Sequence, residues 1–510
     1  MSAEEILDVV IVGAGLSGIG AAYHLTAKCP GKTYAILESR DAIGGTWDLF
    51  RYPGIRSDSD MHTLGFNFKP WTEAKAIADG PSIRKYVNET ADEHQIRQHI
   101  RFGHAVRRAS WSSDDASWTI QAEHDGAMVE IRCRFLMMCS GYYNYAEGYT
   151  PEFEGMTSYR GTVVHPQHWP EDLDYSGKKV VVIGSGATAM TLVPAMADAA
   201  ESVTMIQRSP TYVVSRPDQD RIANMLRKVL PERWAYAVTR FKNTKAQAFI
   251  YGRSRTRPDK IKAMLLKEVR EALGPDYDVD KHFTPNYNPW DQRLCLIPNG
   301  DLYQAINRGK ATVVTGTIDR ITEHGVRMTD GEEIEADILV TATGLKLMLL
   351  GGAEFSVDGE KVDFPSTYAY KGMMYSDVPN LIQTFGYINA SWTLRADLTS
   401  EYACRVINRM DELGVQQVTP RLREADRDMK TQNWIEDFSA GYMQRMMHLF
   451  PKQGDRDPWR NTQNYTLDKK LVHKAPLEDG ALIFGKSASV IRWPDDHVSL
   501  QSDESAVSAG

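Results

Sequence analysis

Two segments of the chain share one order of apolar and polar positions. Each has a short unbroken apolar run, a glycine-rich turn, a helical pattern and a second apolar run. The predicted strands span Asp8–Val12, Thr33–Leu37, Lys178–Ile183 and Val203–Gln207, and the predicted helices span Ile19–Ala27 and Thr188–Ala199. Unbroken apolar runs are typical of parallel strands that are buried on both faces. The pattern therefore predicts an α/β fold with two Rossmann-like dinucleotide-binding domains.

The first glycine turn has the residues that a nucleotide diphosphate requires. Gly13, Gly15 and Gly18 let the backbone approach a pyrophosphate, and Ser17 lies just before a helix whose N-terminus favours negative charge. Glu38 follows the second strand, 20 residues after Gly18, where an acid binds ribose hydroxyls. An acid here suits an adenosine without a 2′-phosphate, so this half is predicted to bind FAD or NAD.

The second glycine turn ends differently. Its predicted cofactor-binding residues are Gly184, Ser185, Gly186, Ala187 and Thr188. Arg208 and Ser209 stand where the first unit has its acid. A cation and a hydroxyl at that place match a 2′-phosphate, which predicts NADP(H) in this half. The alternative for Arg208 is a solvated surface charge.

A loop rich in glycine and aromatic residues follows the first unit. It begins with Gly44-Gly45-Thr46-Trp47 and ends at Asp58. Glycine, aromatic and polar residues in this density indicate a structured loop rather than a strand or a helix. By itself, Asp58 in such a loop is read as the cap of a turn.

A second unusual stretch, Tyr159–Pro170, lies between the two glycine turns. Gly161 can supply a fixed turn, His165 can hydrogen-bond on both sides, and Trp169 gives a large anchor with a polar edge. Pro170 stiffens the path. The stretch is predicted to be a hinge between cofactor domains; an ordinary linker with a satisfied histidine is the alternative.

These two stretches resemble the motifs of the type I Baeyer–Villiger monooxygenases, which are class B flavoprotein monooxygenases. The hinge matches aromatic-x-Gly-x-x-x-His-x-x-x-Trp-Pro, with Tyr159 where Phe is usual. The loop matches Gly-Gly-x-Trp-x4-aromatic-Pro-Gly-x-x-x-Asp. The segments closest to the ethionamide-activating subgroup are Gly44–Asp60, His165–Tyr175, Val181–Thr188, Asn286–Leu302 and Ala390–Leu398. The resemblance runs from about Asp8 to about Tyr465.

The resemblance implies a reaction and its residues. NADPH would reduce FAD, O2 would give a C4a-peroxyflavin, and a ketone would become an ester or a lactone; sulfides or thioamides would also be S-oxygenated. Gly45, Thr46 and Trp47 would continue along the bound flavin, and Asp58 would project towards its reacting edge. Arg293 matches the active-site arginine of the family, and Asp58 would pair with it and hold it. His165 is expected to act in domain movement and not as an acid or base.

The same resemblance implies a division of the chain. The expected parts are an FAD-binding domain over 1–148, a hinge over 149–176, an NADP-binding domain over 177–340 with a helical insertion at about 215–285, a second FAD segment over 341–494, and a flexible tail over 495–510. Three further patterns concern the fold. They are a helix over Ser82–His99, a helix over Leu394–Met410, and an amphipathic core or tunnel segment over Trp434–Phe450. For the second helix, one interpretation is that its N-terminal amides point at the flavin, and the alternative is a plain capped helix.

Charge and cysteine content limit the kinds of partner and compartment that we expect for this protein. The net charge of −8 does not favour nucleic acid, and the acidic N-terminus differs from a signal peptide. The five cysteines lack the spacing of a disulfide framework, a zinc site or a dithiol centre, so we expect a cytoplasmic protein without metal. Arg221–Arg270 is basic, with 14 Lys or Arg against three acids. A solvated basic face is one interpretation, and peripheral contact with anionic lipid is the other.

Three other functions compete with a ketone oxygenase. The first is an N- or S-oxygenating flavin monooxygenase without ketone activity, which the two Baeyer–Villiger motifs disfavour. The second is a dithiol flavoprotein reductase, which the cysteine spacing disfavours. The third is a flavin- and NADP-binding redox sensor without turnover, in which Arg293 and Asp58 would be idle.

Overall fold

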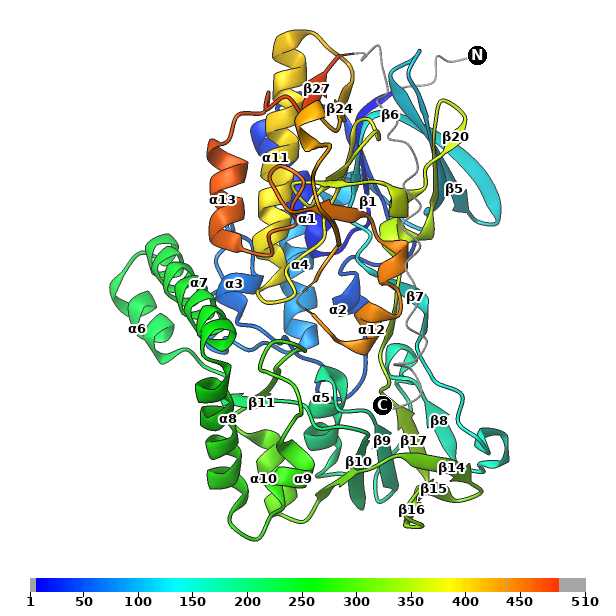
Figure 1. Ribbon diagram of the computed structural model, residues 1–510, viewed down its shortest axis with the longest axis vertical. Coiled ribbons are helices and arrows are strands. Elements are labelled where there is room, and N and C mark those ends of the chain that lie inside the picture. Colours follow the sequence, from blue (N-terminus) through cyan, green and yellow to red (C-terminus); the bar gives the residue numbers. More distant parts are fainter. Residues whose placement is uncertain (1–5, 437, 486–510) are drawn as a thin grey trace.

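The computed structural model describes residues 6–436 and 438–485. Two sheets organise the molecule, one in the upper half of Figure 1 and one in the lower half. The chain forms the first sheet, crosses to the second, and then returns to the first. The α/β class and the two Rossmann-like units that the apolar runs predict are therefore confirmed.

The upper sheet is built around β1, which lies between β2 and β6 with parallel pairing to both. Its strand order is β20-β19-β4-β5-β6-β1-β2-β3, and β23 also pairs with β6. The strands span β1 Leu7–Val12, β2 Tyr34–Leu37, β3 Ile100–Arg101, β4 Ala105–Ser112, β5 Ser117–His124, β6 Ala127–Met138, β19 Glu354–Val357, β20 Glu360–Lys361 and β23 Leu381–Gln383. The antiparallel β4-β5-β6 meander follows the period-two alternation of its sequence.

The lower sheet is parallel throughout, in the order β13-β10-β9-β17-β8. Its strands span β8 Thr162–Val164, β9 Lys179–Ile183, β10 Ser202–Gln207, β13 Ala311–Thr315 and β17 Ile338–Thr341. The edge strand β8 comes from the stretch that carries the hinge motif. It pairs with β17 from Ile338 to Val340. Part of the hinge motif is thus ordered as a strand of the lower sheet.

The chain passes between the two halves along two adjacent strands. β7 (Tyr143–Gly148) leads down and β18 (Leu345–Leu347) leads back, and the two pair antiparallel. The two crossings therefore lie side by side. Any rotation of one half against the other must bend both.

Helices cover the sheets. In the upper half α1 packs against α11, and in the lower half α5 packs against α10. The principal helices span α1 Leu16–Lys28, α4 Gly80–Glu93, α5 Ala187–Met196, α10 Asp301–Asn307, α11 Trp392–Leu413 and α13 Tyr465–Lys474. The helix predicted over Ser82–His99 is too long: α4 ends at Glu93, and Gln95 has a φ of 56°, which an α-helix does not allow. The prediction over Leu394–Met410 is confirmed by α11.

The basic segment after β11 (Val213–Arg216) forms a group of helices. They span α6 Arg221–Val229, α7 Glu232–Thr256, α8 Pro258–Leu273 and α9 Val279–Phe283. In Figure 1, α6 and α7 form the outermost layer on the left, and α8 continues down beside α10. In the described residues no helix is long and apolar enough to cross a membrane. The tail predicted over 495–510 lies outside the described residues.

The amphipathic segment predicted over Trp434–Phe450 contains α12 (Gly441–Gln444) and a 3-10 turn at Met447–Leu449 instead of one helix. Its apolar side chains enter the core of the lower half and of the junction between the halves. The buried members include Trp434, Ile435, Phe438, Met443, Met447 and Phe450. Core packing is one of the two roles that the sequence left open for this segment.

Candidate active site

A cavity of about 1190 Å³ lies between the upper and lower halves. Pockets for one drug-sized ligand are usually about 300–1,000 Å³, so this space has room for more than one ligand. The predicted cofactor-binding residues that line it are Gly13, Gly15, Ser17, Glu38, Gly45, Thr46, Trp47, Asp58, Gly184, Ser185, Gly186, Ala187, Thr188, Arg208 and Ser209. Arg293 lines it too. Residues far apart in the sequence therefore converge on one space.

The first glycine turn shows why its glycines are required. A Cβ on Gly13, whose φ is +104°, would lie 2.6 Å from the carbonyl oxygen of Cys139. A Cβ on Gly18 would lie 1.8 Å from the carbonyl oxygen of Gly13, so Gly18 supports the turn from behind and does not line the cavity. Gly15 faces Gly45, whose own Cβ would lie 3.1 Å from the Cα of Gly15. The two glycine loops are thus in close contact.

Glu38 is held where the first turn and the end of β2 meet. Its carboxylate accepts hydrogen bonds from the backbone N–H of Ala14 at 2.7 Å and of Arg40 at 2.9 Å. Burial raises the pKa of Glu38, although these donors oppose the rise. A carboxylate fixed at this place fits a ribose hydroxyl of an adenine dinucleotide.

The second glycine turn has a more open form. A Cβ on Gly184, with a φ of +131°, would lie 2.2 Å from the carbonyl oxygen of Ala342, whereas a Cβ on Gly186 would meet no atom within 4 Å. Gly186 therefore leaves its backbone open to the cavity at the start of α5. Arg208 and Ser209 are exposed at the end of β10, and the hydroxyl of Ser185 donates to the carbonyl oxygen of Ser209 at 3.3 Å. Open backbone amides and an exposed arginine fit a phosphorylated dinucleotide.

Arg293 and Asp58 form an ion pair in the cavity, with 3.0 Å between Nη2 and Oδ2. Asp58 belongs to the upper half, and Arg293 precedes β12 (Cys295–Pro298) of the lower half. Their side chains are 39% and 33% exposed. Burial of the guanidinium opposes its charge, but the neighbouring Asp58 carboxylate outweighs this and raises the pKa of Arg293. The arginine is therefore a permanent cation that faces the open space.

Several aromatic residues around this pair have no signal in the sequence. The ring of Tyr142 stacks on that of Trp392 with 5.1 Å between centroids, and the Trp392 indole donates to the Ser17 hydroxyl at 2.8 Å. Tyr442 comes from α12, and burial raises the pKa values of both Tyr142 and Tyr442. Trp392 begins α11, so the N-terminus of that helix lines the cavity. No periodic pattern in the sequence marks these aromatic residues, and only tertiary folding brings them together.

The hinge-motif residues lie outside the cavity, at the crossing between the halves. His165 Nδ1 accepts from the backbone N–H of Gln167 at 3.2 Å, and a Cβ on Gly148 would lie 2.0 Å from the imidazole. The Tyr159 hydroxyl donates to the Ala336 carbonyl oxygen at 3.0 Å. Gly161 has no room for a Cβ, which would lie 2.4 Å from the Asp337 carbonyl oxygen.

Trp169 is buried in the lower core and Pro170 is exposed. Burial lowers the pKa of His165, although hydrogen bonds to the backbone of Gly344 and Tyr149 oppose the shift. A neutral imidazole wedged on Gly148 is sensitive to the relative position of the two crossing strands. This placement agrees with a conformational role and not with proton transfer at the cavity.

The cysteine thiols beside the cavity are only weakly acidic. All five cysteines are buried and free, and burial raises the pKa of Cys139 and of Cys295 to about 12. Both of these thiols line the cavity. Because they remain protonated at neutral pH, they are poor nucleophiles.

The chain resembles known flavoproteins over nearly its whole length. A flavin-binding monooxygenase-like family model matches residues 74–273, and an NAD(P)-binding Rossmann-like domain model matches residues 11–79. The FAD-containing monooxygenase EthA of Mycobacterium tuberculosis is 54% identical over 483 residues, which cover 94% of this chain and 98% of EthA. The chain belongs to the flavin-containing monooxygenase family. Within this family, EthA of Mycolicibacterium smegmatis is 52% identical over 96% of this chain and 99% of its own length.

Solved structures agree with the fold. An oxidized steroid monooxygenase bound to NADP has a TM-score of 0.77 and 22% identity, and the match covers 95% of this chain and all of that one. A form of OTEMO in complex with FAD and NADP has a TM-score of 0.74 and 20% identity over the same shares. At this identity the likeness concerns the fold, which is that of two-domain flavin monooxygenases.

Proposed function

We propose that this protein is an NADPH-dependent FAD monooxygenase that inserts one oxygen atom from O2 into ketones, giving esters or lactones, and that it also oxygenates the sulfur of sulfides or thioamides. The observation that carries the proposal is the Arg293–Asp58 pair in the cavity between the two glycine turns. It places a fixed positive charge where both dinucleotide cradles open.

The two cradles divide the cofactors between them. Glu38 and the closely packed Gly13–Gly18 turn suit the adenosine and pyrophosphate of FAD, while Gly186, Arg208 and Ser209 suit the 2′-phosphate and pyrophosphate of NADPH. When bound, the reduced flavin supplies activated oxygen and NADPH supplies the hydride that reduces it. Gly45, Thr46 and Trp47 lie along the same cavity wall and would hold the flavin against the first turn.

Arg293 would stabilise negative charge as it develops on the substrate carbonyl oxygen. Its guanidinium keeps its charge at every working pH and offers several N–H donors. A preorganised donor at a developing oxyanion lowers the barrier by about 3 kcal/mol. Asp58 fixes the direction of the guanidinium, and the protonated hydroxyls of Tyr142 and Tyr442 add no competing negative charge.

The rate of sulfur oxygenation should depend less on Arg293 than the rate of ketone oxygenation does. A sulfide attacks the activated oxygen with its own lone pair, so no oxyanion develops on a substrate carbonyl. Arg293 should therefore matter more for ketones than for sulfides. This difference separates the proposed enzyme from a heteroatom oxygenase without ketone activity.

The experiment incubates the purified yellow protein with NADPH, air, and a panel of linear, cyclic and aryl ketones plus thioanisole. We expect esters or lactones one oxygen heavier than the ketones, and the sulfoxide. Sulfoxide alone would assign a heteroatom oxygenase, and NADPH oxidation with only hydrogen peroxide across the panel would overturn the proposal. Arg320→Ala is the control variant, because Arg320 lies in the lower half, is partly exposed, pairs with Glu154, and does not line the cavity.

A further inference from the structure

The α6–α7 hairpin exposes apolar side chains to an unusual degree. Fourteen large apolar side chains are exposed in the described part of the chain, and ten of them lie between 222 and 264. They are Ile222, Met225, Val229, Leu230, Trp234, Val238, Phe241, Phe249, Ile250 and Met264. Scattered exposed apolar residues are normal, but a concentration of this kind indicates an interaction surface.

The inner face of α7 is the polar one. Tyr236, Arg240, Asn243 and Gln247 repeat every three or four residues and point towards the upper half. Tyr236 donates to the carbonyl oxygen of Phe66 at 2.9 Å. Asn243 and Gln247 donate to the two carboxylate oxygens of Asp60, at 2.9 and 3.3 Å.

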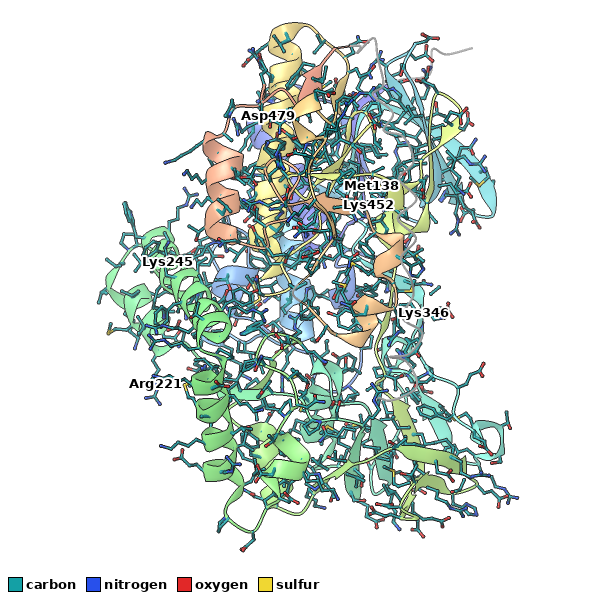
Figure 2. The ribbon with its side chains drawn as sticks, viewed as in Figure 1. Met138, Arg221, Lys245, Lys346, Lys452 and Asp479 are labelled. Atoms are coloured by element: carbon teal, nitrogen blue, oxygen red, sulfur yellow. The ribbon has the colours of Figure 1, made fainter. Side chains whose placement is uncertain are left out.

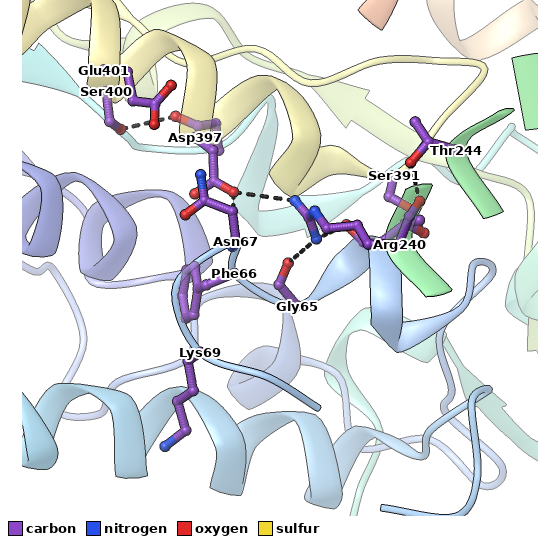
Figure 3. Close-up of polar contacts among 12 residues, drawn as sticks. Gly65, Phe66, Asn67, Lys69, Arg240, Thr244, Ser391, Asp397, Ser400 and Glu401 are labelled. Carbon is purple, nitrogen blue, oxygen red and sulfur yellow. Dashed lines mark hydrogen bonds and ion pairs between the residues drawn. The ribbon is translucent and has the colours of Figure 1, made fainter. Parts of the chain in front are cut away.

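Arg240 is the deepest contact of this inner face. Figure 3 shows its guanidinium between the carbonyl oxygen of Gly65, at 2.8 Å, and the carboxylate of Asp397 on α11, at 3.2 Å. His24 of α1 contacts the other carboxylate oxygen of Asp397 at 3.1 Å. The helix is therefore attached to the upper half by a buried ion pair and by hydrogen bonds, which fix the direction of its opposite face.

The outer face of α7 is apolar and basic. Trp234, Val238, Phe241, Lys245 and Phe249 share the face opposite to the inner residues, by helical spacing. The rings are largely exposed, at 68% for Trp234, 65% for Phe241 and 63% for Phe249. A soluble helix usually buries its apolar face, so this reversed arrangement is not explained by the folding of the chain.

Positive charge surrounds the exposed rings. The ammonium of Lys245 lies 5.8 Å from the ring centre of Phe241, and the guanidinium of Arg253 lies 5.1 Å from that of Phe249. Figure 2 shows Arg221 and Lys245 on this outer hairpin. From 221 to 257 the sequence has ten Lys or Arg and a single acid, Glu232, in a chain whose net charge is −8. The charge of the hairpin is thus opposite to that of the whole.

We propose that the outer face of α6 and α7 docks on the surface of an anionic lipid bilayer. Exposed aromatic and aliphatic side chains beside Lys and Arg are the combination that holds a helix in the plane of a membrane interface. Each basic residue near an anionic leaflet adds attraction. A two-fold contact with a second copy would bring the basic residues of this outer face, such as Lys245 and Arg253, against their own copies, which disfavours that occupant.

The test is sedimentation of the full-length holoprotein with vesicles. One set contains phosphatidylcholine alone and the other an equal mixture of phosphatidylcholine and phosphatidylglycerol. We expect strong binding to the anionic set at low salt, weak binding to the neutral set, and loss of the difference at high salt. Equal binding to both sets, or binding to neither, would overturn the proposal.

Variants separate the two contributions. Replacing Lys228, Arg233 and Lys245 by Gln should weaken binding to the anionic set about a hundredfold. Trp234→Ser, Phe241→Ser and Phe249→Ser together should abolish binding to both sets. The matched control is Met128→Ser with Leu413→Ser, two exposed apolar residues away from the hairpin, and it should bind as the unmodified protein does.

The alternative occupant is tested on the same variants by light scattering during gel filtration. If the three ring substitutions convert an oligomer into a monomer and the unmodified protein does not bind vesicles, then the outer face of α6 and α7 joins copies of the chain. The lipid proposal is then wrong. NADPH oxidation by each variant checks that it is folded, because none of these side chains lines the cavity.

Discussion

Replacing Arg293 by Ala should uncouple cofactor oxidation from oxygen insertion. The substitution removes the permanent cation of the cavity and leaves both glycine turns intact. We therefore expect NADPH to be consumed at a rate within a few-fold of the unmodified enzyme. Ester formation should fall by about 10²–10³, the effect of losing one preorganised donor at a developing oxyanion.

The geometry of the pair shows that the effect is on catalysis and not on folding. Two unit charges 3.0 Å apart attract by about 5 kcal/mol at an effective dielectric constant of about 20. Here about a third of each side chain is open to the cavity, so solvent screens the pair and its contribution to stability falls to about 1 kcal/mol or less. Arg293→Ala should accordingly unfold within about 2 °C of the unmodified protein.

The assay measures ester, hydrogen peroxide and NADPH in one reaction. Arg293→Lys, which keeps the charge but loses the planar fork, should form more ester than Arg293→Ala and less than the unmodified enzyme. Asp58→Asn should reduce ester formation less than Arg293→Ala, because the cation remains but is less well directed. Unchanged ester yield per NADPH in Arg293→Ala would refute the reasoning, and so would an equal loss of ketone and sulfide oxygenation.

Three other substitutions test separate parts of the structure. Arg208→Ala should remove a charge-assisted hydrogen bond to the 2′-phosphate. In rapid-mixing measurements of flavin reduction, the Kd for NADPH should rise about 10–100-fold and the Kd for NADH should stay unchanged. An equal rise of both Kd values would contradict the assignment. Burial lowers the pKa of His165, so the folded state prefers the neutral ring and loses stability as pH falls below about 6.5, the usual value in an unfolded chain. His165→Gln should remove that acid-side loss, and denaturant midpoints that change equally with pH in both proteins would disprove it. Arg240→Gln should lower the free energy of denaturant unfolding by about 3 kcal/mol, because the buried Asp397 carboxylate loses its charged partner. Adding Asp397→Asn should recover part of that stability. If the two substitutions lower the free energy of unfolding additively, the two residues are not coupled.

Much of the fold could be predicted from the sequence because its signals are local. The unbroken apolar runs locate β1, β2, β9 and β10 to within one residue, and the glycine turns fall between strand and helix as their backbone requires. Glu38 and Arg208 could be placed for the same reason, since each directly follows a strand of known direction. The spacing of glycines and of the residue after each strand therefore predicts the cofactor-facing residues on both sides of the cavity.

The remaining features depend on contacts between distant segments. The stacking of Tyr142 on Trp392 joins a loop after β6 to the start of α11, and no spacing in the sequence predicts this contact. The edge strand β8 is only three residues long and is fixed by its partner β17. The outward direction of the apolar face of α7 depends on Arg240, whose partner Asp397 lies 157 residues away. Helical periodicity gives two faces but does not say which one is buried.

The most direct measurement is the mass of the product from one linear ketone and NADPH under ¹⁸O2. We expect an ester that carries one ¹⁸O atom, formed in proportion to the NADPH consumed, and a strong loss of that ester in Arg293→Ala. Recovery of the unchanged ketone with all reducing equivalents in hydrogen peroxide, while thioanisole becomes its sulfoxide, would show that the Arg293–Asp58 site does not oxygenate carbonyl carbon.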